Sequence, residues 1–217
     1  MTGEFPTALL LIIGGLVLPF FKGIWQKIWA LTIPIIAFVH LLQFTHGLHG
    51  EISFLNFTLV TMRVDKLSLL FGYIFLLAGF INAIYALHSK DIGQQVAMFL
   101  YSGSALGAVF AGDLLTLFVF WELTAVSSVF LIWARKTDKA FKAGMRYLII
   151  QLISGLLLLV GVLIFNNAQN TLEFSSMNLG EPGVILIFLA FGIKTAFPLM
   201  HSWLQDAYPE ATEIGTV

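Results

Sequence analysis

Long runs of apolar residues recur along the chain and constrain its fold more than any other feature. A helix that crosses a bilayer needs about 20 consecutive, mostly apolar residues. Hydrophobic residues make up 59% of the 217 residues and charged residues only 11%, against roughly 25% charged residues in soluble domains. The sequence therefore predicts an all-α integral membrane protein, with residues 1–217 as a single transmembrane domain. About seven spans are expected, at Thr7–Phe21, Ile24–Phe44, Leu67–Leu87, Gly93–Ala111, Leu114–Ala134, Ala143–Phe165 and Gly183–Leu204.

The segments between these runs also carry information. Gly112-Asp113 leaves room only for a tight helical hairpin between two spans, and Ile52–Met62 is expected as a short hairpin lying on the membrane surface. Met1–Pro6 lacks the basic start of a cleavable signal peptide. The first apolar run is therefore interpreted as a span.

The basic residues indicate the orientation. Loops rich in Lys and Arg face the cytoplasm, and five such residues lie between the fifth and sixth spans. Lys22, Lys27 and Lys90 fall on the same predicted side, whereas the opposite side is mainly acidic and includes Glu4. We expect a multi-pass protein of the cell (inner) membrane, with the N-terminus outside and the basic loop 135–146 in the cytoplasm. The five basic residues of this loop are Arg135, Lys136, Lys139, Lys142 and Arg146.

Composition also excludes several classes of function. A net charge of −1 gives no electrostatic basis for binding nucleic acid. The chain has no cysteine, which excludes disulfides, Cys-ligated zinc and iron–sulfur chemistry. The sequence contains no convincing metal-ligand spacing and no glycine-rich nucleotide loop. No cofactor and no metal are therefore expected, and the chain shows no redox centre of its own.

Two charged residues lie inside predicted spans, where they are costly. Glu122 lies within Leu114–Ala134 and Lys194 within Gly183–Leu204. Each costs about 2.5–3.5 kcal/mol at a bilayer centre on insertion scales, so such residues usually face a protein interior or a watery cavity. An acid and a base on two spans are typical of an ion or proton path. The alternatives are a protonated Glu122 bonded to a neighbouring helix, or a static buried ion pair.

The residues around these charges refine the hypothesis. Pro198 removes the amide that would bond the carbonyl of Lys194, which predicts a kink beside the lysine. His201 follows Lys194 by seven positions, so we expect both on nearly the same helix face, where His201 either relays protons or bonds a backbone carbonyl. Thr124, Ser127 and Ser128 are close enough along the helix to bond Glu122 or a water beside it. His40, Asn82 and Gln151 are interpreted as polar contacts between helices.

Two motifs resemble a known family. The stretch Gly192–Thr212, GIKTAFPLMHSWLQDAYPEAT, is similar to the signature of antiporter-like membrane subunits, and Trp121-Glu122 with its following Ser/Thr residues resembles their fifth-helix glutamate motif. These subunits occur in respiratory complex I, Mrp-type cation/proton antiporters and membrane-bound hydrogenases. Tyr208–Thr212 and the ending Gly215–Val217 look most similar to the D-type Mrp subunit and its hydrogenase counterpart.

The resemblance assigns roles and a wider architecture. It implies that Lys194 is the central proton-carrying lysine, that Glu122 is its paired acid, and that His201 matches the family's histidine. Gln205 stands where the family usually has a proline, and Glu213-Ile214 stands where a Pro-Thr-like pair is common. Family members have about fourteen spans in two inverted repeats, so this chain corresponds to an N-terminal half. It is either half of a split subunit that another chain completes or a truncated sequence.

The predicted function is proton translocation in a multisubunit Na⁺/H⁺ antiporter. The alternatives are a proton-pumping subunit of a complex I-like oxidoreductase or hydrogenase, or a structural subunit without transport. The expected partners are other membrane subunits, including one that supplies the second half, together with protons, Na⁺ or K⁺, and the lipid bilayer.

Overall fold

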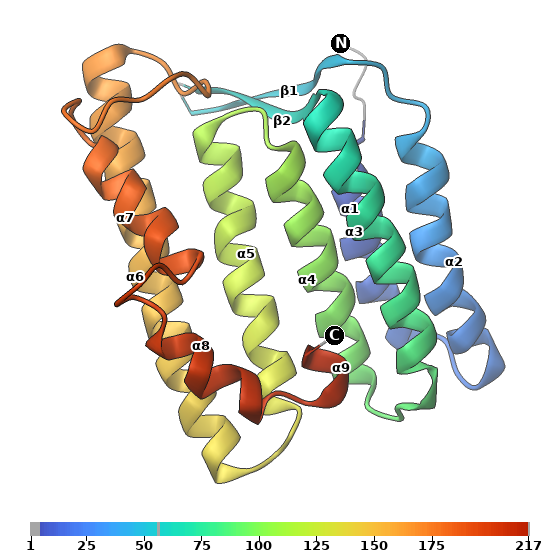
Figure 1. Cartoon of the computed structure of the whole chain (residues 1–217). Helices are drawn as coiled ribbons and strands as arrows, with labels where there is room; N and C mark the ends of the chain where they lie inside the picture. Colours follow the sequence, from blue (N-terminus) through green and yellow to red (C-terminus); the bar gives the residue numbers. More distant parts are fainter. Residues whose placement is uncertain (1–4, 56, 217) are drawn as a thin grey trace.

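A computed structural model describes residues 5–55 and 57–216, and helices occupy all seven predicted spans in it, side by side (Figure 1). Glu4 and Val217, which belonged to the sequence predictions, lie outside the described residues. The prediction of a helical membrane fold is confirmed. The helices are α1 (Thr7–Val17), α2 (Ile24–Leu41), α3 (Lys66–Tyr85), α4 (Ile92–Phe110), α5 (Leu114–Trp133), α6 (Asp138–Gln169) and α7 (Val184–Lys194).

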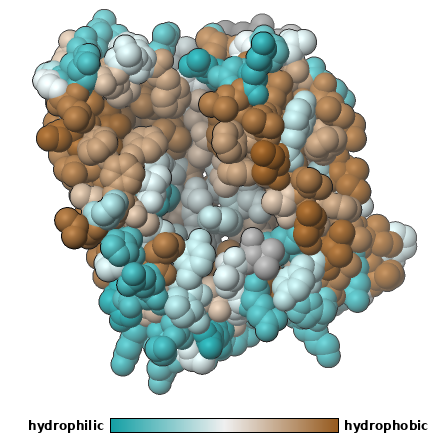
Figure 2. Space-filling model, in the orientation of Figure 1, coloured by the Kyte–Doolittle hydropathy of each residue, from teal (hydrophilic) through white to brown (hydrophobic). Residues whose placement is uncertain are grey.

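Apolar length differs among these helices. Among the described residues, α2, α3, α5 and α6 are long and apolar enough to cross a membrane, while α1 and α7 are shorter apolar helices. On the face shown in Figure 2, apolar side chains cover both sides of the bundle and polar ones gather at its two ends. The remaining elements are the short helices α8 (Ser202–Ala207) and α9 (Glu213–Thr216), the 3₁₀ turns Leu18–Phe20, Ala86–His88 and Tyr208–Glu210, and the strands β1 (Gly47–Phe54) and β2 (Phe57–Val64).

The order in which the helices pack decides which residues can meet. Helix α4 packs against α1, α3 and α5, while α6 packs between α5 and α7 (Figure 1). Helix α8 then returns against α6. Helices α5 and α7 therefore lie on either side of α6, close enough for the rings of Trp121 and Phe191 to contact each other.

The predicted hairpin is confirmed and is longer than expected. Strands β1 and β2 pair antiparallel from Gly47↔Val64 to Phe54↔Phe57. Val60 accepts a hydrogen bond from the Gly112 amide at 3.0 Å and donates its own amide to Asp113 Oδ2 at 2.6 Å. Asp113 is also the N-cap of α5, so the hairpin fixes the point at which α5 begins.

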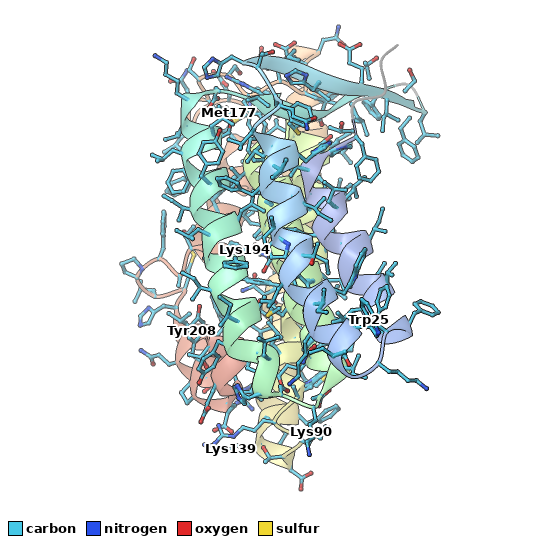
Figure 3. The ribbon with its side chains drawn as sticks, turned by 90° about the vertical axis from the view of Figure 1, so that its right-hand side faces the viewer. Trp25, Lys90, Lys139, Met177, Lys194 and Tyr208 are labelled. Carbon is cyan, nitrogen blue, oxygen red and sulfur yellow. The ribbon has the colours of Figure 1, made fainter. Side chains whose placement is uncertain are left out.

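The opposite end of the bundle carries the basic residues. Figure 3 shows Lys90 and Lys139 at this end and Met177 at the other. Lys136 forms an ion pair of 2.9 Å with Asp91, the N-cap of α4. The hydrogen bond from Lys136 holds the pKa of Asp91 below its usual range. The loops 86–91 and 134–137 therefore meet at one end, as the topology predicted.

The seventh span departs from the prediction, because α7 ends at Lys194 and does not continue to Leu204. The Phe197 amide bonds the Gly192 carbonyl at 2.8 Å and the Ala196 amide bonds the Ile193 carbonyl at 3.2 Å. With Ala196 at a φ of 56°, this pattern is a Schellman motif, which closes a helix with a left-handed residue. Pro198 follows directly, so the helix stops at the lysine where only a kink was predicted.

Candidate functional site

Lys194 lies about halfway along the bundle, at the last position of α7 (Figure 3). Its Nζ donates a hydrogen bond of 3.1 Å to the main-chain carbonyl of Trp121 on α5. The same Nζ lies 5.0 Å from the centre of the Trp121 ring, a distance that allows a cation–π interaction. The lysine side chain thus spans from α7 to α5 and contacts the residue directly before Glu122.

Glu122 lies against α6. A Cβ added at Gly155 would overlap Glu122 Oε1, so the missing side chain of this glycine makes room for the carboxylate. Oε1 is buried and has no hydrogen-bond partner among the described residues. No ion pair joins Glu122 and Lys194 in this part of the chain. The two predicted residues are brought to one site, but their charges are held apart.

The hydroxyl groups near Glu122 do not bond it, contrary to expectation. Thr124 donates to the Phe120 carbonyl at 2.5 Å and Ser127 to the Leu123 carbonyl at 2.6 Å. Mid-helix Ser and Thr commonly bond the carbonyl four residues back. Thr124 is also only two residues from Glu122, and such residues do not share a helix face. Proximity in sequence was therefore a misleading guide here.

His201 lies apart from Lys194, because the expected shared helix face is absent. The chain between them leaves the helix, with left-handed backbone at Ala196 and at Leu199 (φ 73°). His201 is the N-cap residue of α8 and makes no side-chain capping bond there. No hydrogen bond or ion pair joins it to Lys194 among the described residues. The Schellman turn and Pro198 together redirect the chain.

A cavity of about 330 Å³ opens beside Lys194. It extends toward Tyr208, at the end of the bundle that carries Lys139 (Figure 3). Within it the hydroxyl groups of Ser128 and Tyr147 are 2.6 Å apart. The cavity therefore connects the lysine to the basic end through polar groups. These polar lining residues are Tyr101, Thr124, Ser128, Tyr147, Gln151, Lys194, Tyr208 and Thr216.

Helix α6 supplies residues that the motifs did not point to. Ser154 donates to the Ala190 carbonyl at 2.9 Å and ties α6 to α7. Gly155 and Tyr147 lie on the same helix, and no local signal in the sequence marked them.

Of the polar residues expected to bridge helices, His40 does so, at 3.0 Å from Thr7. The prediction is wrong for Gln151, whose amide atoms both lack a partner in the described residues.

A family model supports the resemblance found in the motifs. Residues 111–217 match the model described as NADH:quinone oxidoreductase/Mrp antiporter, TM. The matched segment includes both Glu122 and Lys194. The chain is also 28% identical over 221 residues to the Na⁺/H⁺ antiporter subunit A1 of Staphylococcus haemolyticus and 27% identical over 221 residues to that of Staphylococcus aureus.

These relatives are longer than the chain. The alignments cover 90% of this chain but only 27% and 28% of the two relatives. Both relatives are named A-type subunits, so the resemblance of the ending to D-type subunits stays a prediction from the sequence. The names of these relatives support the resemblance to antiporter subunits, but they do not support the D-type assignment.

Two solved structures share the fold. A chain of the archaeal membrane-bound sulfane sulfur reductase matches with a TM-score of 0.78 at 22% identity, and a chain of respiratory complex I from Thermus thermophilus with a TM-score of 0.77 at 18% identity. The matches cover 97% and 96% of this chain but 48% of each of those chains. The chain thus spans about half the length of these proteins. Fold, family model and motif residues agree, and over residues 111–217 the chain is similar to the antiporter-like family of membrane subunits.

Proposed function

We propose that this chain is a proton-translocating subunit of a multisubunit Na⁺/H⁺ antiporter, and that Lys194 takes up and releases protons under the control of Glu122. One observation carries the proposal. The Lys194 amine is bonded to the carbonyl of Trp121, next to a Glu122 carboxylate whose Oε1 has no hydrogen-bond partner among the described residues. An acid and a base that are adjacent but unpaired have two arrangements available, apart and together.

The two arrangements differ in charge stabilisation. Two unit charges 4 Å apart interact by about 4 kcal/mol at an effective dielectric constant of 20, several times RT. When Lys194 meets Glu122, its ammonium form is favoured and a proton is held. When they separate, this stabilisation is lost and the ammonium gives up its proton more readily. Movement of one side chain thus converts charge separation into proton release.

The local backbone supports such a movement. Lys194 is the last residue of α7, and the carbonyl groups at a helix C-terminus favour positive charge. The helix ends at this residue, so no further turn of α7 follows it. The Trp121 carbonyl and ring then act as the position that holds the ammonium away from Glu122. His201, at the start of α8, is proposed as a proton relay that acts after Lys194 and has no direct bond to it.

The proposal also includes a membrane orientation, a coupled cation and partner subunits. The N-terminus lies outside, loop 135–146 faces the cytoplasm, and the cavity from Lys194 to Tyr208 opens toward that side. Relatives named Na⁺/H⁺ antiporter subunits favour Na⁺ as the coupled cation. The solved structures that share the fold are chains of membrane complexes, so the proposed partners are other membrane subunits.

Proton flux through the assembled complex tests this function. Glu122→Ala and Lys194→Ala should each lower the flux by about 100-fold, within the range for loss of a group that transfers protons. Lys142→Ala, exposed near the start of α6, and Glu181→Ala, at the other end of the bundle, serve as charge-matched controls and should keep the flux. Undiminished flux in both site variants would rule out the proton path and favour a structural role.

A second candidate is a proton-pumping subunit of a respiratory complex. The two solved structures that share the fold are respiratory membrane complexes. The same lysine would then be driven by electron transfer on other subunits. The set of co-purifying chains decides between the two: soluble subunits with cysteine-ligated clusters indicate the respiratory complex, and their absence indicates the antiporter.

A further inference from the structure

Gln151 is the most deeply buried polar side chain of the cavity beside Lys194. Its side chain is 0% exposed, and neither its Oε1 nor its Nε2 has a hydrogen-bond partner among the described residues. It nevertheless lines the same cavity as Lys194. An amide with both ends unpaired inside a membrane protein requires an explanation, because each unpaired buried group costs about 1–3 kcal/mol.

The position of Gln151 on α6 indicates what it serves. Tyr147, Gln151 and Gly155 are spaced four residues apart and therefore share one helix face. Gly155 contacts the Glu122 carboxylate, while Tyr147 bonds Ser128 nearer the basic end of the bundle. Gln151 thus lies one helical turn from each, between the charged residues and the hydroxyl pair.

Water satisfies the requirements of this site. A cavity of about 330 Å³ is large enough for several molecules, since water occupies roughly 30 Å³ in the liquid. Ordered water also needs two to four polar partners, and the amide, the Lys194 amine and the two hydroxyl groups offer them. An amide both donates and accepts, so Gln151 can bond one water through its Nε2 and another through its Oε1.

Resting on the proposed function, we propose that Gln151 is a positioning residue that holds ordered water between Lys194 and the Tyr147–Ser128 pair. The Lys194 ammonium gives a proton to the first water, and that water passes one of its own protons to the next acceptor. Each water ends with the composition it began with. Gln151 does not itself change protonation, and its role is to keep the waters aligned.

A stability measurement tests the water without any assay of transport. Gln151→Leu replaces the amide by an apolar side chain of similar size in the assembled complex. If water bonds the amide, the substitution removes those bonds and the thermal midpoint falls or stays level. If the cavity is dry, the substitution relieves two unpaired polar atoms and the midpoint rises, which would overturn the proposal. A high-resolution map of the wild-type complex should show water within hydrogen-bond distance of Gln151.

Proton flux tests the positioning role and separates it from the proposed function. Gln151→Leu should slow the flux on the order of tenfold, matching an ordered water position lost from the path, and Gln151→Asn or Gln151→His should restore part of it. Ser154→Ala is the matched control on the same helix, because Ser154 is equally buried but bonds α7. Full flux in Gln151→Leu with loss in Lys194→Ala overturns the role of Gln151 alone. Full flux in Lys194→Ala overturns the proposed function, while the map and the midpoint still report on the water.

Discussion

At the scale of single residues, Gly155 decides where the Glu122 carboxylate lies. The two residues come from adjacent helices, and a methyl group at Gly155 would occupy the place of Glu122 Oε1. The glycine therefore matters for the space it leaves and not for its backbone conformation. Trp121 positions Lys194 in a different way, because its main-chain carbonyl and its ring both contact the lysine amine.

This contact predicts a coupling between Gly155 and Glu122. Gly155→Ala should lower the free energy of unfolding by about 1–3 kcal/mol, the usual cost of overpacking. In a Glu122→Ala background the same change should cost little, because the colliding oxygen is gone. A double-mutant cycle on thermal stability measures this coupling. Gly79→Ala is the control, since the nearest atom to its added Cβ is Ser102 Oγ at 4.0 Å, and equal costs in both backgrounds would contradict the account.

At the scale of elements, the sequence predicted the positions of the helices but not the end of α7 at Lys194. The apolar runs predicted the positions of the helices well, because a span must be apolar over its length whatever its neighbours. The break after Lys194 depends on Ala196 adopting a left-handed backbone, a role in which glycine is usual. No local signal marked Ala196, so the placement of His201 on the face of Lys194 was wrong.

The left-handed backbone at Ala196 predicts the effect of a substitution. Non-glycine residues pay roughly 1–2 kcal/mol in this conformation. Ala196→Gly should therefore raise the stability of the complex by about 1 kcal/mol and leave proton flux intact. Ala190→Gly, inside the same helix, should lower stability by a similar amount. Thermal unfolding of both variants checks this, and a destabilising Ala196→Gly would show that the Schellman turn is not maintained.

The start of α3 predicts a pH dependence. Asp65 caps this helix and accepts hydrogen bonds from the Ser68 amide at 2.8 Å and the Leu67 amide at 2.9 Å. The Ser68 amide contributes most to lowering the pKa of Asp65 below its ordinary value of 3.8. A lowered pKa means that the ionised cap stabilises the folded state above the unfolded pKa, and that this stabilisation is lost as the pH falls through the folded pKa.

The thermal midpoints of the wild type and Asp65→Asn test this dependence. The wild type should be the more stable at pH 7, and the difference should narrow below about pH 4. Asparagine can still cap the helix, so the variant isolates the charge from the cap. A difference that is constant between pH 7 and pH 3 would show that the charge of Asp65 contributes nothing.

At the scale of the whole molecule, the charge distribution distinguishes the two ends of the bundle. The Lys136–Asp91 ion pair joins two loops at the basic end, and the hairpin of β1 and β2 lies at the opposite end (Figure 1). The sequence predicted this division because loop charge acts locally and needs no tertiary contact. The site could be predicted only in part. Glu122 and Lys194 stood out by their cost, whereas Gly155 and Tyr147 gain their roles only when α6 packs between α5 and α7.

The absence of native cysteine makes the orientation testable. Single substitutions Leu55→Cys in the hairpin and Lys139→Cys at the start of α6 place one thiol at each end, at side chains that are highly exposed. A membrane-impermeant maleimide added to intact cells should label Leu55→Cys, and should label Lys139→Cys only after the membrane is opened. Labelling with the reverse pattern would invert the proposed topology.

The central claim is that Lys194 carries protons and is not a fixed charge, and Lys194→Arg tests it most directly. Arginine keeps the positive charge, and it can still reach the Trp121 carbonyl and ring, but it does not release its proton in proteins. Proton flux through the assembled complex should therefore fall about 100-fold in Lys194→Arg, as far as in Lys194→Ala. Retained flux in Lys194→Arg, with loss in Lys194→Ala, would show that the site needs only a static charge and would contradict the account.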